Sequence, residues 1–512
     1  MKEQQYQELC DITDEVLLAS DATPARVAIP WLHIVREHPV FLEQYEHLFI
    51  PYRWFQYHLK SQMHLFRNIL SIVKVILKAV IRRHANNRAG IIKKIPQADV
   101  LFISHLLNPK QYKDEDDFYF SNLPEKLADD GYRSLTALIN HFGVSSNQYS
   151  LKQEKLRSKM VLSDTMGVRQ ELLNIGKLWK ESRSLKRAAK AELDPFKKKV
   201  LCWAAVEAVS PSSLNTIRLF QQIRKIVVST KPNLMIATHE GHAWERIAFH
   251  GARSANPEVQ CLGYTHAPLF RLQHAVKRCL AKEYNPDKIF TSGYIQKNQL
   301  DKSESLNNVP IEILGSGKCF NESSISNEPM RKSLNNSYHQ QTCLVIPEGI
   351  RSETELMFRF SLECATQNPN IMFIWRLHPI LSFEAIVTNN SELKTLPENI
   401  KVSDKKLNDD LKQSQWALYR GTSTIIQAVI YGLKPLYLTI PDELNIDPLY
   451  EMNSWKSQIE TPNDFINVLN LNKDEEREKN IALNYCLDFY TSFNHKTIIK
   501  TINVLTKNIV IR

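Results

Sequence analysis

Residues 415–438 read QWALYRGTSTIIQAVIYGLKPLYL. The stretch opens with an apolar run, turns through Arg-Gly-Thr-Ser-Thr, continues as a helix from about residue 423, and ends in a second apolar run at 435–438. A strand, a helix and another strand in this order form a βαβ unit, which joins two parallel strands of one sheet. The stretch therefore predicts an α/β domain with a parallel sheet.

Upstream of this unit the alternation of strands and helices continues in two groups. In the nearer group, strands are predicted at 342–346, 370–376, 399–403 and 415–419, with a helix at 352–367. In the farther group, strands are predicted at 98–104, 233–238, 259–264, 287–291 and 310–314, with helices at 213–229 and 243–255. The Ser- and Asn-rich stretch between them has little to bury and indicates a linker. Each group predicts a Rossmann-like parallel sheet.

The alternation divides the chain into five parts. We expect an N-terminal helical segment (1–95), a first Rossmann-like domain on the acceptor side (96–320), a linker (321–341), a second Rossmann-like domain that binds the nucleotide donor (342–460), and C-terminal helices that pack back across the linker (461–512). Two parallel-sheet domains joined by a hinge leave a cleft between them. Ligands of open α/β sheets bind beyond the carboxyl ends of the strands, so the residues that follow each strand decide the function.

The composition is that of a globular protein with more than one domain. The 512 residues are 43% hydrophobic and 23% charged, and a chain of this length exceeds one ordinary domain. The eight cysteines are scattered without a C-x-x-C pair, which argues against a zinc ribbon or a secreted disulfide framework. The polar start MKEQQYQELCDITDE does not resemble a secretory signal, and no apolar run reaches the roughly 18 residues of a membrane span. We therefore expect a cytoplasmic protein.

The net charge of +10 predicts an anionic partner, which could be nucleic acid, anionic lipid or a phosphorylated substrate. The sequence contains no zinc finger, no RNP-like aromatic strand and no basic helix beside a dimerisation heptad, so no nucleic-acid partner is expected.

A basic helix is predicted at 62–83, QMHLFRNILSIVKVILKAVIRR. At 100° per residue its polar side chains fall on one narrow stripe, which consists of Arg67, Ser71, Lys74, Lys78 and Arg82. An apolar helix with a basic stripe suits the surface of an anionic membrane. A helix buried on three sides, with its charges in solvent, would show the same pattern. The sequence leaves both interpretations open.

Polar residues follow three strands of the second predicted domain. These are Glu348 and Gly349 after the first strand, His378 and Pro379 after the next, with Arg376 just before them, and Thr422, Ser423 and Thr424 at the start of a helix. Backbone N–H groups at a helix start, together with hydroxyls, can bind a phosphate. His378 could donate to a phosphate oxygen, and Arg376 could add a charge-assisted contact or pair with a carboxylate. Each residue also has a structural interpretation, as an N-cap, a strand terminator or an acidic loop residue.

Two strand ends of the first predicted domain carry carboxylates and imidazoles. His239, Glu240, His242 and Glu245 follow the strand at 233–238, and His266 follows the strand at 259–264. Transfer to a hydroxyl needs a base, and Glu or His can serve; Glu240, in the turn, is the first candidate. The histidine spacing matches no common zinc pattern, so no metal is expected. His105, after the first strand, is a weaker candidate for the cleft.

Taken in order, the acid-Gly pair, the His-Pro pair and the Ser/Thr cluster that opens a helix resemble bacterial GT-B glycosyltransferases that use cytidine-nucleotide donors. Sialyltransferases, Kdo transferases of capsule synthesis and glycerophosphotransferases of teichoic acid synthesis share versions of this order. The stretches HEGHAWE (239–245) and GYTHAP (263–268) are similar to acceptor-side loops of surface-carbohydrate transferases. The resemblance covers roughly residues 230–440. It departs at Gln427, where many GT-B enzymes have Glu, and at Pro347, which replaces the first of two acids.

The resemblance implies a GT-B fold in which His378 contacts the donor phosphate, Glu348 and Gly349 shape the cytidine pocket, and Ser423 and Thr424 hold phosphate. It further implies that Glu240 is the catalytic base and that His266 contacts the acceptor or the donor sugar. The expected reaction transfers a nonulosonic acid or Kdo from a CMP-activated donor to a surface polysaccharide or lipid-linked glycan, without a cofactor or metal, at the inner membrane face. Alternatives are a CDP-glycerol glycerophosphotransferase, a GT-B sugar-nucleotide epimerase, and a non-catalytic partner in surface-polysaccharide assembly.

Overall fold

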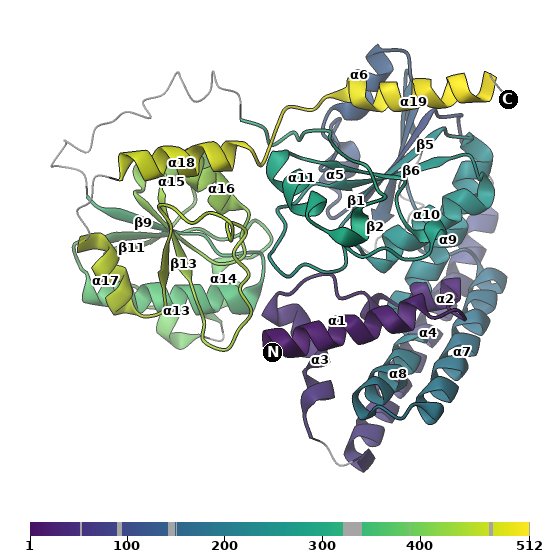
Figure 1. Cartoon of the computed structure of the whole chain (residues 1–512), viewed down its shortest axis with the longest axis horizontal. Helices are drawn as coiled ribbons and strands as arrows, with labels where there is room; N and C mark the ends of the chain where they lie inside the picture. Colours follow the sequence, from purple (N-terminus) through teal and green to yellow (C-terminus); the bar gives the residue numbers. More distant parts are fainter. Residues whose placement is uncertain are drawn as a thin grey trace.

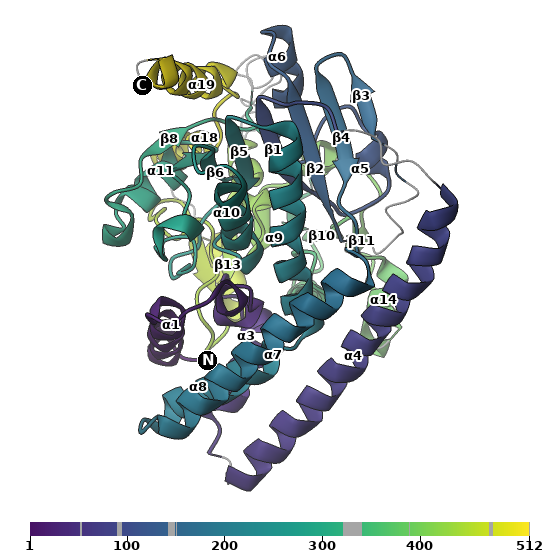
Figure 2. The same cartoon turned by 90° about the vertical axis from the view of Figure 1, so that its right-hand side faces the viewer.

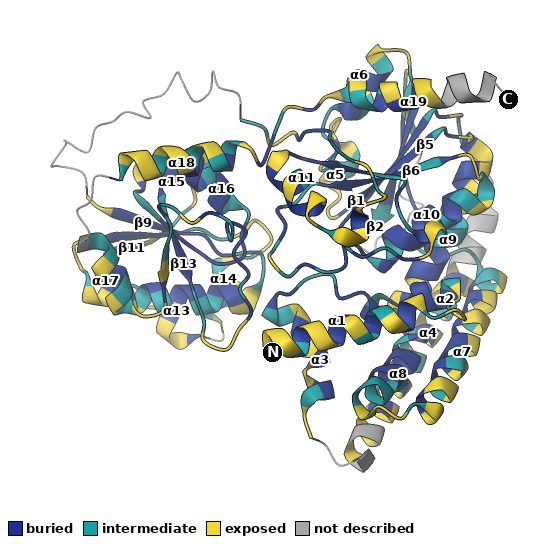
Figure 3. Cartoon of the chain, viewed as in Figure 1, coloured by how far each residue is buried: buried dark blue, intermediate teal, exposed yellow. Residues whose placement is uncertain are grey.

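The computed structural model describes residues 1–51, 54–89, 95–141, 149, 151–320, 340–388, 390–470 and 475–510. Most of the predicted linker, 321–339, lies outside these residues. The chain forms two β-sheets side by side, with helices of the N-terminal part below the first sheet (Figure 1). Buried side chains concentrate on the two sheets and on the helix faces that cover them (Figure 3).

The first sheet has eight strands in the order β3-β4-β2-β1-β5-β6-β7-β8, and all neighbours are parallel except β3 and β4. The strands are β1 (Val100–Leu106), β2 (Ser134–Asn140), β3 (Lys152–Glu154), β4 (Arg157–Val161), β5 (Leu234–Thr238), β6 (Gln260–Thr265), β7 (Lys288–Thr291) and β8 (Ile311–Ile313). The five strands predicted from apolar runs are present within two residues at nearly every end. The sequence analysis missed β2, β3 and β4, which lie on the far side of β1.

Both faces of the first sheet are covered by helices. Leu101 and Ile103 of β1 pack with α9 (Pro211–Thr230) and α10 (Ala243–Ala255). Val100 and Phe102 face the other way, toward α6 (Leu123–Asp129) and α19 (His495–Val510). Alternate residues of a strand point to opposite faces, and burial on both faces explains why this strand reads as a continuous apolar run. The shorter helices α5 (Lys110–Lys113) and α11 (Tyr294–Asp301) complete this part.

The second sheet has six strands in the order β11-β10-β9-β12-β13-β14, all parallel. The strands are β9 (Thr342–Val345), β10 (Met372–Trp375), β11 (Ile400–Val402), β12 (Trp416–Tyr419), β13 (Lys434–Leu438) and β14 (Ser457–Ile459). The helices are α13 (Arg351–Gln367), α14 (Phe383–Val387), α15 (Leu407–Gln413), α16 (Thr424–Ile430), α17 (Pro462–Asn470) and α18 (Glu476–Leu487). One face packs on α16 and α18, and the other on α13 and α17.

Each sheet has a point at which the strand order reverses. In the first sheet the chain runs outward from β1 through β2 and β4, and then restarts on the other side of β1 with β5. In the second sheet it runs from β9 through β10 to β11, and then restarts beside β9 with β12. Ligands of open α/β sheets bind at such switch points, beyond the carboxyl ends of the strands. The two ends to inspect are therefore those of β1 with β5 and of β9 with β12.

The C-terminal chain returns from the second sheet to the first. Its α18 packs on α16, and the following Phe493, Ile498 and Ile502 belong to the core on the outer face of the first sheet. The crossing chain lies so close to Gly293 that a Cβ there would come within 2.3 Å of the Asp488 carbonyl oxygen. Two Rossmann-like sheets linked by such a return constitute the GT-B architecture, as the sequence predicted.

The N-terminal part is helical and forms a bundle with a helical insertion of the first domain. The N-terminal helices are α1 (Glu3–Leu18), α2 (Pro24–Val27), α3 (Pro39–Phe49) and α4 (Trp54–Ala89), and the insertion adds α7 (Val168–Ala191) and α8 (Pro195–Glu207). They share one apolar core, and buried Arg26 of α2 pairs with Glu181 of α7 at 2.6 Å. The sequence analysis did not predict this insertion. Among the described helices, none combines the length and the apolarity that crossing a membrane requires.

Candidate functional site

At the switch point of the first sheet, the loop after β5 is held in one shape by Glu245. The carboxylate of Glu245 accepts hydrogen bonds from the backbone N–H groups of Glu240, Gly241 and His242 at 2.7–3.0 Å. His239 Nδ1 lies 3.1 Å from the same carboxylate. Gly241 has φ +91°, and a Cβ there would lie 2.3 Å from Ala275. Only glycine fits this turn, which fixes where the Glu240 side chain begins.

The Glu240 carboxylate is surrounded by cationic or potentially cationic groups. Arg36 Nη2 lies 2.9 Å from Oε2, His242 Nε2 lies 3.3 Å from the same oxygen, and His266 Nε2 lies 3.9 Å from Oε1. Burial acts to raise the pKa of Glu240, but the charge of Arg36 and the hydrogen bond from His242 outweigh it and hold the pKa well below its ordinary value. Glu240 is therefore ionised at neutral pH and is held by an ion pair with Arg36.

The histidines around Glu240 have different protonation tendencies. Burial lowers the pKa of His266 to about 4, although Glu240 acts in the other direction, and burial lowers the pKa of His105 to about 3. Burial also opposes the charged form of His242, but the hydrogen bond to Glu240 outweighs it and raises the pKa of His242 above its ordinary value. At neutral pH, His266 and His105 are thus neutral. Both ring nitrogens of His105 are engaged, by His141 and Thr238, so His266 is the one of the two that can exchange a hydrogen bond with an uncharged ligand.

Beside this carboxylate, histidines and aromatic rings from several strand ends meet. His105, at the end of β1, lies 2.8 Å from His141 and 3.2 Å from the Thr238 hydroxyl of β5. The ring of Tyr119 meets both His105 and His266 edge to face, with centroids 5.3 and 4.6 Å apart. The parallel pairing of β1 with β5 places His105 beside Thr238 at the end of β5. Aromatic and imidazole groups of this kind suit an uncharged polar ligand such as a sugar.

At the switch point of the second sheet, Glu348 lies between the ends of β9 and β12. Its carboxylate covers the backbone of Gly421, where a Cβ would come within 2.2 Å of Glu348 Oε1. Gly349 lies against the His378 ring, because a Cβ on Gly349 would be 2.9 Å from His378 Nδ1. Burial lowers the pKa of His378, with Glu348 opposing the shift. The predicted residues Glu348, Gly349 and His378 therefore meet, and Pro379 extends the same exposed loop.

The remaining predicted residues of this half lie nearby or point elsewhere. Thr422 is buried, and its hydroxyl accepts from the backbone N–H of Thr424 at 3.3 Å. Ser423 is the residue before α16 and makes no side-chain cap. Arg376 directs its guanidinium at Asp410, 2.6 Å away, and donates to the Lys405 carbonyl. The sequence left two roles open for Arg376, a ligand contact or an ion pair with a carboxylate. The structure shows the ion pair.

A loop of the N-terminal helical segment joins the two switch points, and the sequence analysis did not predict it. Arg36 contacts Glu240 of the first domain, and two residues later His38 Nε2 lies 3.0 Å from Glu348 Oε1 of the second. The charges of both carboxylates raise the pKa of Arg36. The signal was present in WLHIVREHPV (31–40), where four ionisable residues interrupt an apolar stretch. No local pattern, however, indicated which part of the chain they would reach.

His38, Glu348 and Glu353 offer three ligand atoms within 4.8 Å of one another, close enough to raise the question of a metal. The hydrogen bonds favour another role. Val40 N–H donates to His38 Nδ1 at 3.2 Å, so Nε2 carries the proton and donates it to Glu348. Glu353 already binds Arg420 through both oxygens, at 2.9 and 3.1 Å. A metal ligand would need a bare Nε2, and this hydrogen-bonding pattern fits a contact between domains better than a cation site.

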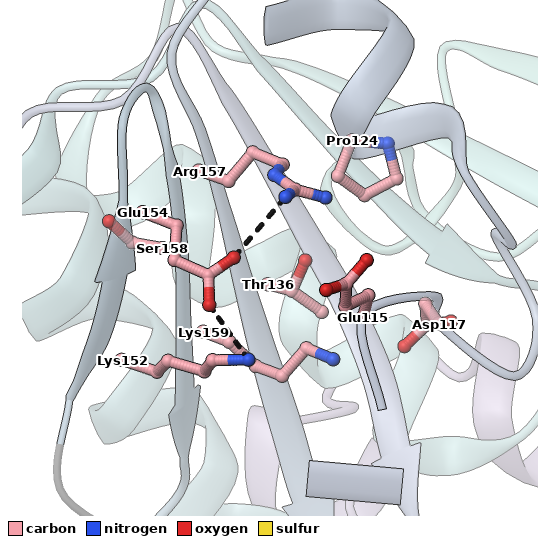
Figure 4. Close-up of a pocket in the computed structure, with 9 residues that line it drawn as sticks. All are labelled: Glu115, Asp117, Pro124, Thr136, Lys152, Glu154, Arg157, Ser158 and Lys159. Atoms are coloured by element: carbon pink, nitrogen blue, oxygen red, sulfur yellow. Dashed lines mark hydrogen bonds and ion pairs between the residues drawn. The ribbon is translucent and has the colours of Figure 1, made fainter. Parts of the chain in front are cut away.

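A separate polar pocket lies at the edge of the first sheet, around β4 (Figure 4). Its charges pair with one another, because Glu154 contacts Lys152 at 2.8 Å and Arg157 at 3.2 Å. None of the predicted site residues lines this pocket. The two switch points, joined by the 36–38 loop, remain the candidate site.

No family model matches the sequence, and no curated protein matches it. Among solved structures, the chain is similar to an α,α-trehalose 6-phosphate synthase from Burkholderia multivorans, with 9% identity, a TM-score of 0.45, and coverage of 81% of this chain and 98% of that one. It is also similar to a UDP-GlcNAc 2-epimerase from Neisseria meningitidis bound to UDP-GlcNAc, with 11% identity, a TM-score of 0.41, and coverage of 81% and 100%. A calicheamicin glycosyltransferase matches with 10% identity, a TM-score of 0.44, and coverage of 80% and 98%.

Proposed function

We propose that the protein is a glycosyltransferase that moves a sugar from a nucleotide donor to a hydroxyl group of a glycan acceptor. The observation that carries the proposal is the 36–38 loop. It joins an ionised Glu240 at one switch point to Glu348 at the other, with Arg36 beside Glu240. A carboxylate base and a cation close together suit a reaction that takes a proton from a hydroxyl while an anionic phosphate leaves.

The donor is assigned to the second domain. His378, with the Thr422, Ser423 and Thr424 backbone and hydroxyls, is the proposed phosphate contact, and Glu348 with Gly349 is the proposed contact with the nucleoside. Glu348 fits a ribose or base better than a phosphate, because two anions repel. Arg376 is a weaker member of this set, since Asp410 holds its guanidinium. The order of these motifs supports a CMP-activated nonulosonic acid or Kdo as the donor.

The acceptor is assigned to the first domain, where His105, Tyr119 and His266 surround Glu240. In the proposed step, Glu240 takes the proton of the acceptor hydroxyl, whose oxygen forms the bond to the anomeric carbon. The bond between that carbon and the phosphate oxygen breaks, and its electron pair leaves with CMP. The ion pair with Arg36 lowers the basicity of Glu240 in the empty site. A donor phosphate that attracts Arg36 would weaken this pair and raise the pKa of Glu240 toward its ordinary value.

Arg36 and His378 can offset the charge of a single leaving phosphate, so the proposed step uses no metal. The proposed acceptor is a growing surface or lipid-linked glycan on the inner face of the membrane.

The first test is thermal stabilisation by CMP, CDP, UDP, GDP and ADP, since a ligand that binds the folded state raises the unfolding temperature. Stabilisation by CMP that is lost in His378→Ala supports the donor assignment. His495→Ala is the matched control, because His495, the first residue of α19, pairs with Asp130 at the end of α6, away from both switch points. Preference for UDP would replace the CMP donor with a UDP-sugar. Stabilisation by none of the five nucleotides would contradict the transferase proposal and favour a non-catalytic role in assembly.

A further inference from the structure

Helix α4 carries a continuous row of exposed apolar side chains on its outer face. The row consists of Leu59, Met63, Phe66, Leu70, Val73, Leu77, Val80 and Ile81, each between 39% and 70% exposed. Single exposed apolar residues are ordinary, but a contiguous row of this kind marks a surface that meets another apolar phase. We call this row the α4 ridge.

The α4 ridge follows from the spacing of apolar residues along the helix. From Leu59 to Val80 the members are four, three, four, three, four and three residues apart, which keeps them on one side of a helix. At about 1.5 Å per residue the ridge is roughly 32 Å long. It is a straight edge rather than a scattered set of side chains.

The opposite face of α4 is already occupied. Leu65 and Ile72 are buried in the core that α4 shares with α7 and α8, and the polar Asn68 donates to the Val206 carbonyl of α8. In Figure 2, α4 runs beside α7 along the outer surface of the molecule. The inner face thus anchors the helix, and the α4 ridge remains a second, outward apolar face. The interpretation of 62–83 as a helix buried on three sides with only charges in solvent is therefore wrong.

The charges of α4 identify the kind of partner. Residues 54–89 contain seven Lys or Arg and no Asp or Glu, and Arg67 and Lys74 are exposed along one flank of the ridge. A second copy of this helix would bring no carboxylate to pair with these cations, which disfavours self-association along the ridge. An anionic surface supplies what they lack. A long apolar edge flanked by cations is the pattern of a helix that lies in the plane of an anionic bilayer.

We propose that α4 docks the protein on an anionic lipid bilayer, with the α4 ridge at the boundary between headgroups and acyl chains and with Arg67 and Lys74 at the level of the lipid phosphates. The proposal stands on α4 alone and does not depend on the transfer reaction. It differs from the sequence prediction in one respect: the basic stripe is the flank of the docking face, and the apolar row beside it is the face itself.

The test is co-sedimentation of the full chain with vesicles of phosphatidylcholine, with and without phosphatidylglycerol. Wild type is expected to bind the anionic vesicles and to bind neutral ones weakly. Phe66→Ser with Leu70→Ser should reduce binding by on the order of a hundredfold, because two large apolar groups no longer insert. Arg67→Gln with Lys74→Gln should reduce it by roughly thirtyfold and only on anionic vesicles. Leu193→Ser, at a 94% exposed leucine between α7 and α8, is the matched control and should bind as wild type does.

Unfolding temperatures equal to that of wild type would show that the ridge variants are folded, which is expected because both residues are about half exposed or more. If the ridge variants unfold at lower temperature than wild type, the test rests on wild type alone, whose vesicle binding should increase with phosphatidylglycerol and decrease with salt. The proposal would be overturned if wild type bound vesicles equally well with and without phosphatidylglycerol, or if folded ridge variants bound them as wild type does. So would a concentration-dependent dimer that the ridge substitutions dissolve, since the ridge would then be a contact between copies.

Discussion

Glu37, between the two site residues of the 36–38 loop, is a fully buried carboxyl group whose removal should stabilise the protein in a pH-dependent way. One of its oxygens accepts from the Leu272 N–H at 2.8 Å, and the other has no hydrogen-bond partner among the described residues. Burial raises its pKa from 4.5 to about 8. The folded protein therefore holds a proton that the unfolded chain releases above pH 4.5.

The size of the effect follows from this difference. Each pH unit between the two pKa values weakens the folded state by about 1.4 kcal/mol. At pH 7 the penalty therefore approaches roughly 3 kcal/mol as an upper bound. It is absent below pH 4.5, grows as the pH rises, and stops growing above about pH 8. Glu37→Gln keeps the shape and the hydrogen bond but cannot ionise in either state, so it should be more stable than wild type at pH 7 and equal to it near pH 4.5.

The assay is the thermal unfolding midpoint of Glu37→Gln and wild type from pH 4.5 to 8.5, read as a difference because a chain of two domains does not define a single free energy of unfolding. Glu3→Gln is the control. Glu3 is half exposed, and its hydrogen bond with Arg271 lowers its pKa. Replacing Glu3 should therefore give no increase in the unfolding midpoint that grows with pH. A constant difference between Glu37→Gln and wild type across this range would refute the argument, because it would mean that Glu37 releases its proton in the folded state.

Three further substitutions test the site. Glu240→Gln should lower transfer by at least a hundredfold, since it removes the proposed base, while CMP stabilises the variant as it does wild type; equal activity would remove Glu240 from the mechanism. Gly421→Ala should leave the unfolding midpoint nearly unchanged but weaken stabilisation by CMP, because its Cβ would push Glu348 aside, and unchanged nucleotide binding would mean that Glu348 does not contact the nucleotide. Gly241→Ala should lower the unfolding midpoint, since its φ is +91° and Ala275 blocks the Cβ. Its control is Gly176→Ala, in open space within α7, which should raise stability by about 1 kcal/mol. Similar unfolding midpoints for the two variants would contradict the reasoning.

The sequence predicted those parts of the fold that local patterns determine. Strands such as β1 and β9 are short apolar runs because both faces of their sheets are covered, and the polar residues after them mark the carboxyl ends. β4, with the sequence RSKMV, was missed because it lies next to the edge strand of its sheet and begins with three polar residues, so it is not an apolar run. The insertion of α7 and α8 was missed because its core is completed by helices from the distant N-terminus.

The candidate site was predicted in its separate parts but not in its assembly. Glu240 and Glu348 were identified because each lies in the turn just after a strand. Their partners Arg36 and His38 lie 204 and 310 residues away in the chain, and no periodicity records a contact of that separation. Arg376 illustrates the converse case. Its position at the end of a predicted strand left a ligand contact open, yet buried Asp410, 34 residues on, holds the guanidinium.

The 36–38 loop changes how the site balances charge. Without it, Glu348 would lose its hydrogen bond from His38 and Glu240 would keep His242 but lose Arg36, so an incoming phosphate would meet less compensated negative charge at both ends of the cleft. Arg36 neutralises Glu240, and its charge also interacts with Glu348, which receives a hydrogen bond from His38. If the proposed function holds, the donor phosphate enters a site to which the N-terminal segment, rather than either sheet, contributes the charge of Arg36. The N-terminal segment is then part of the catalytic unit, because the same loop that leads into α3 of the helical bundle supplies the charge that makes the cleft receptive to an anion.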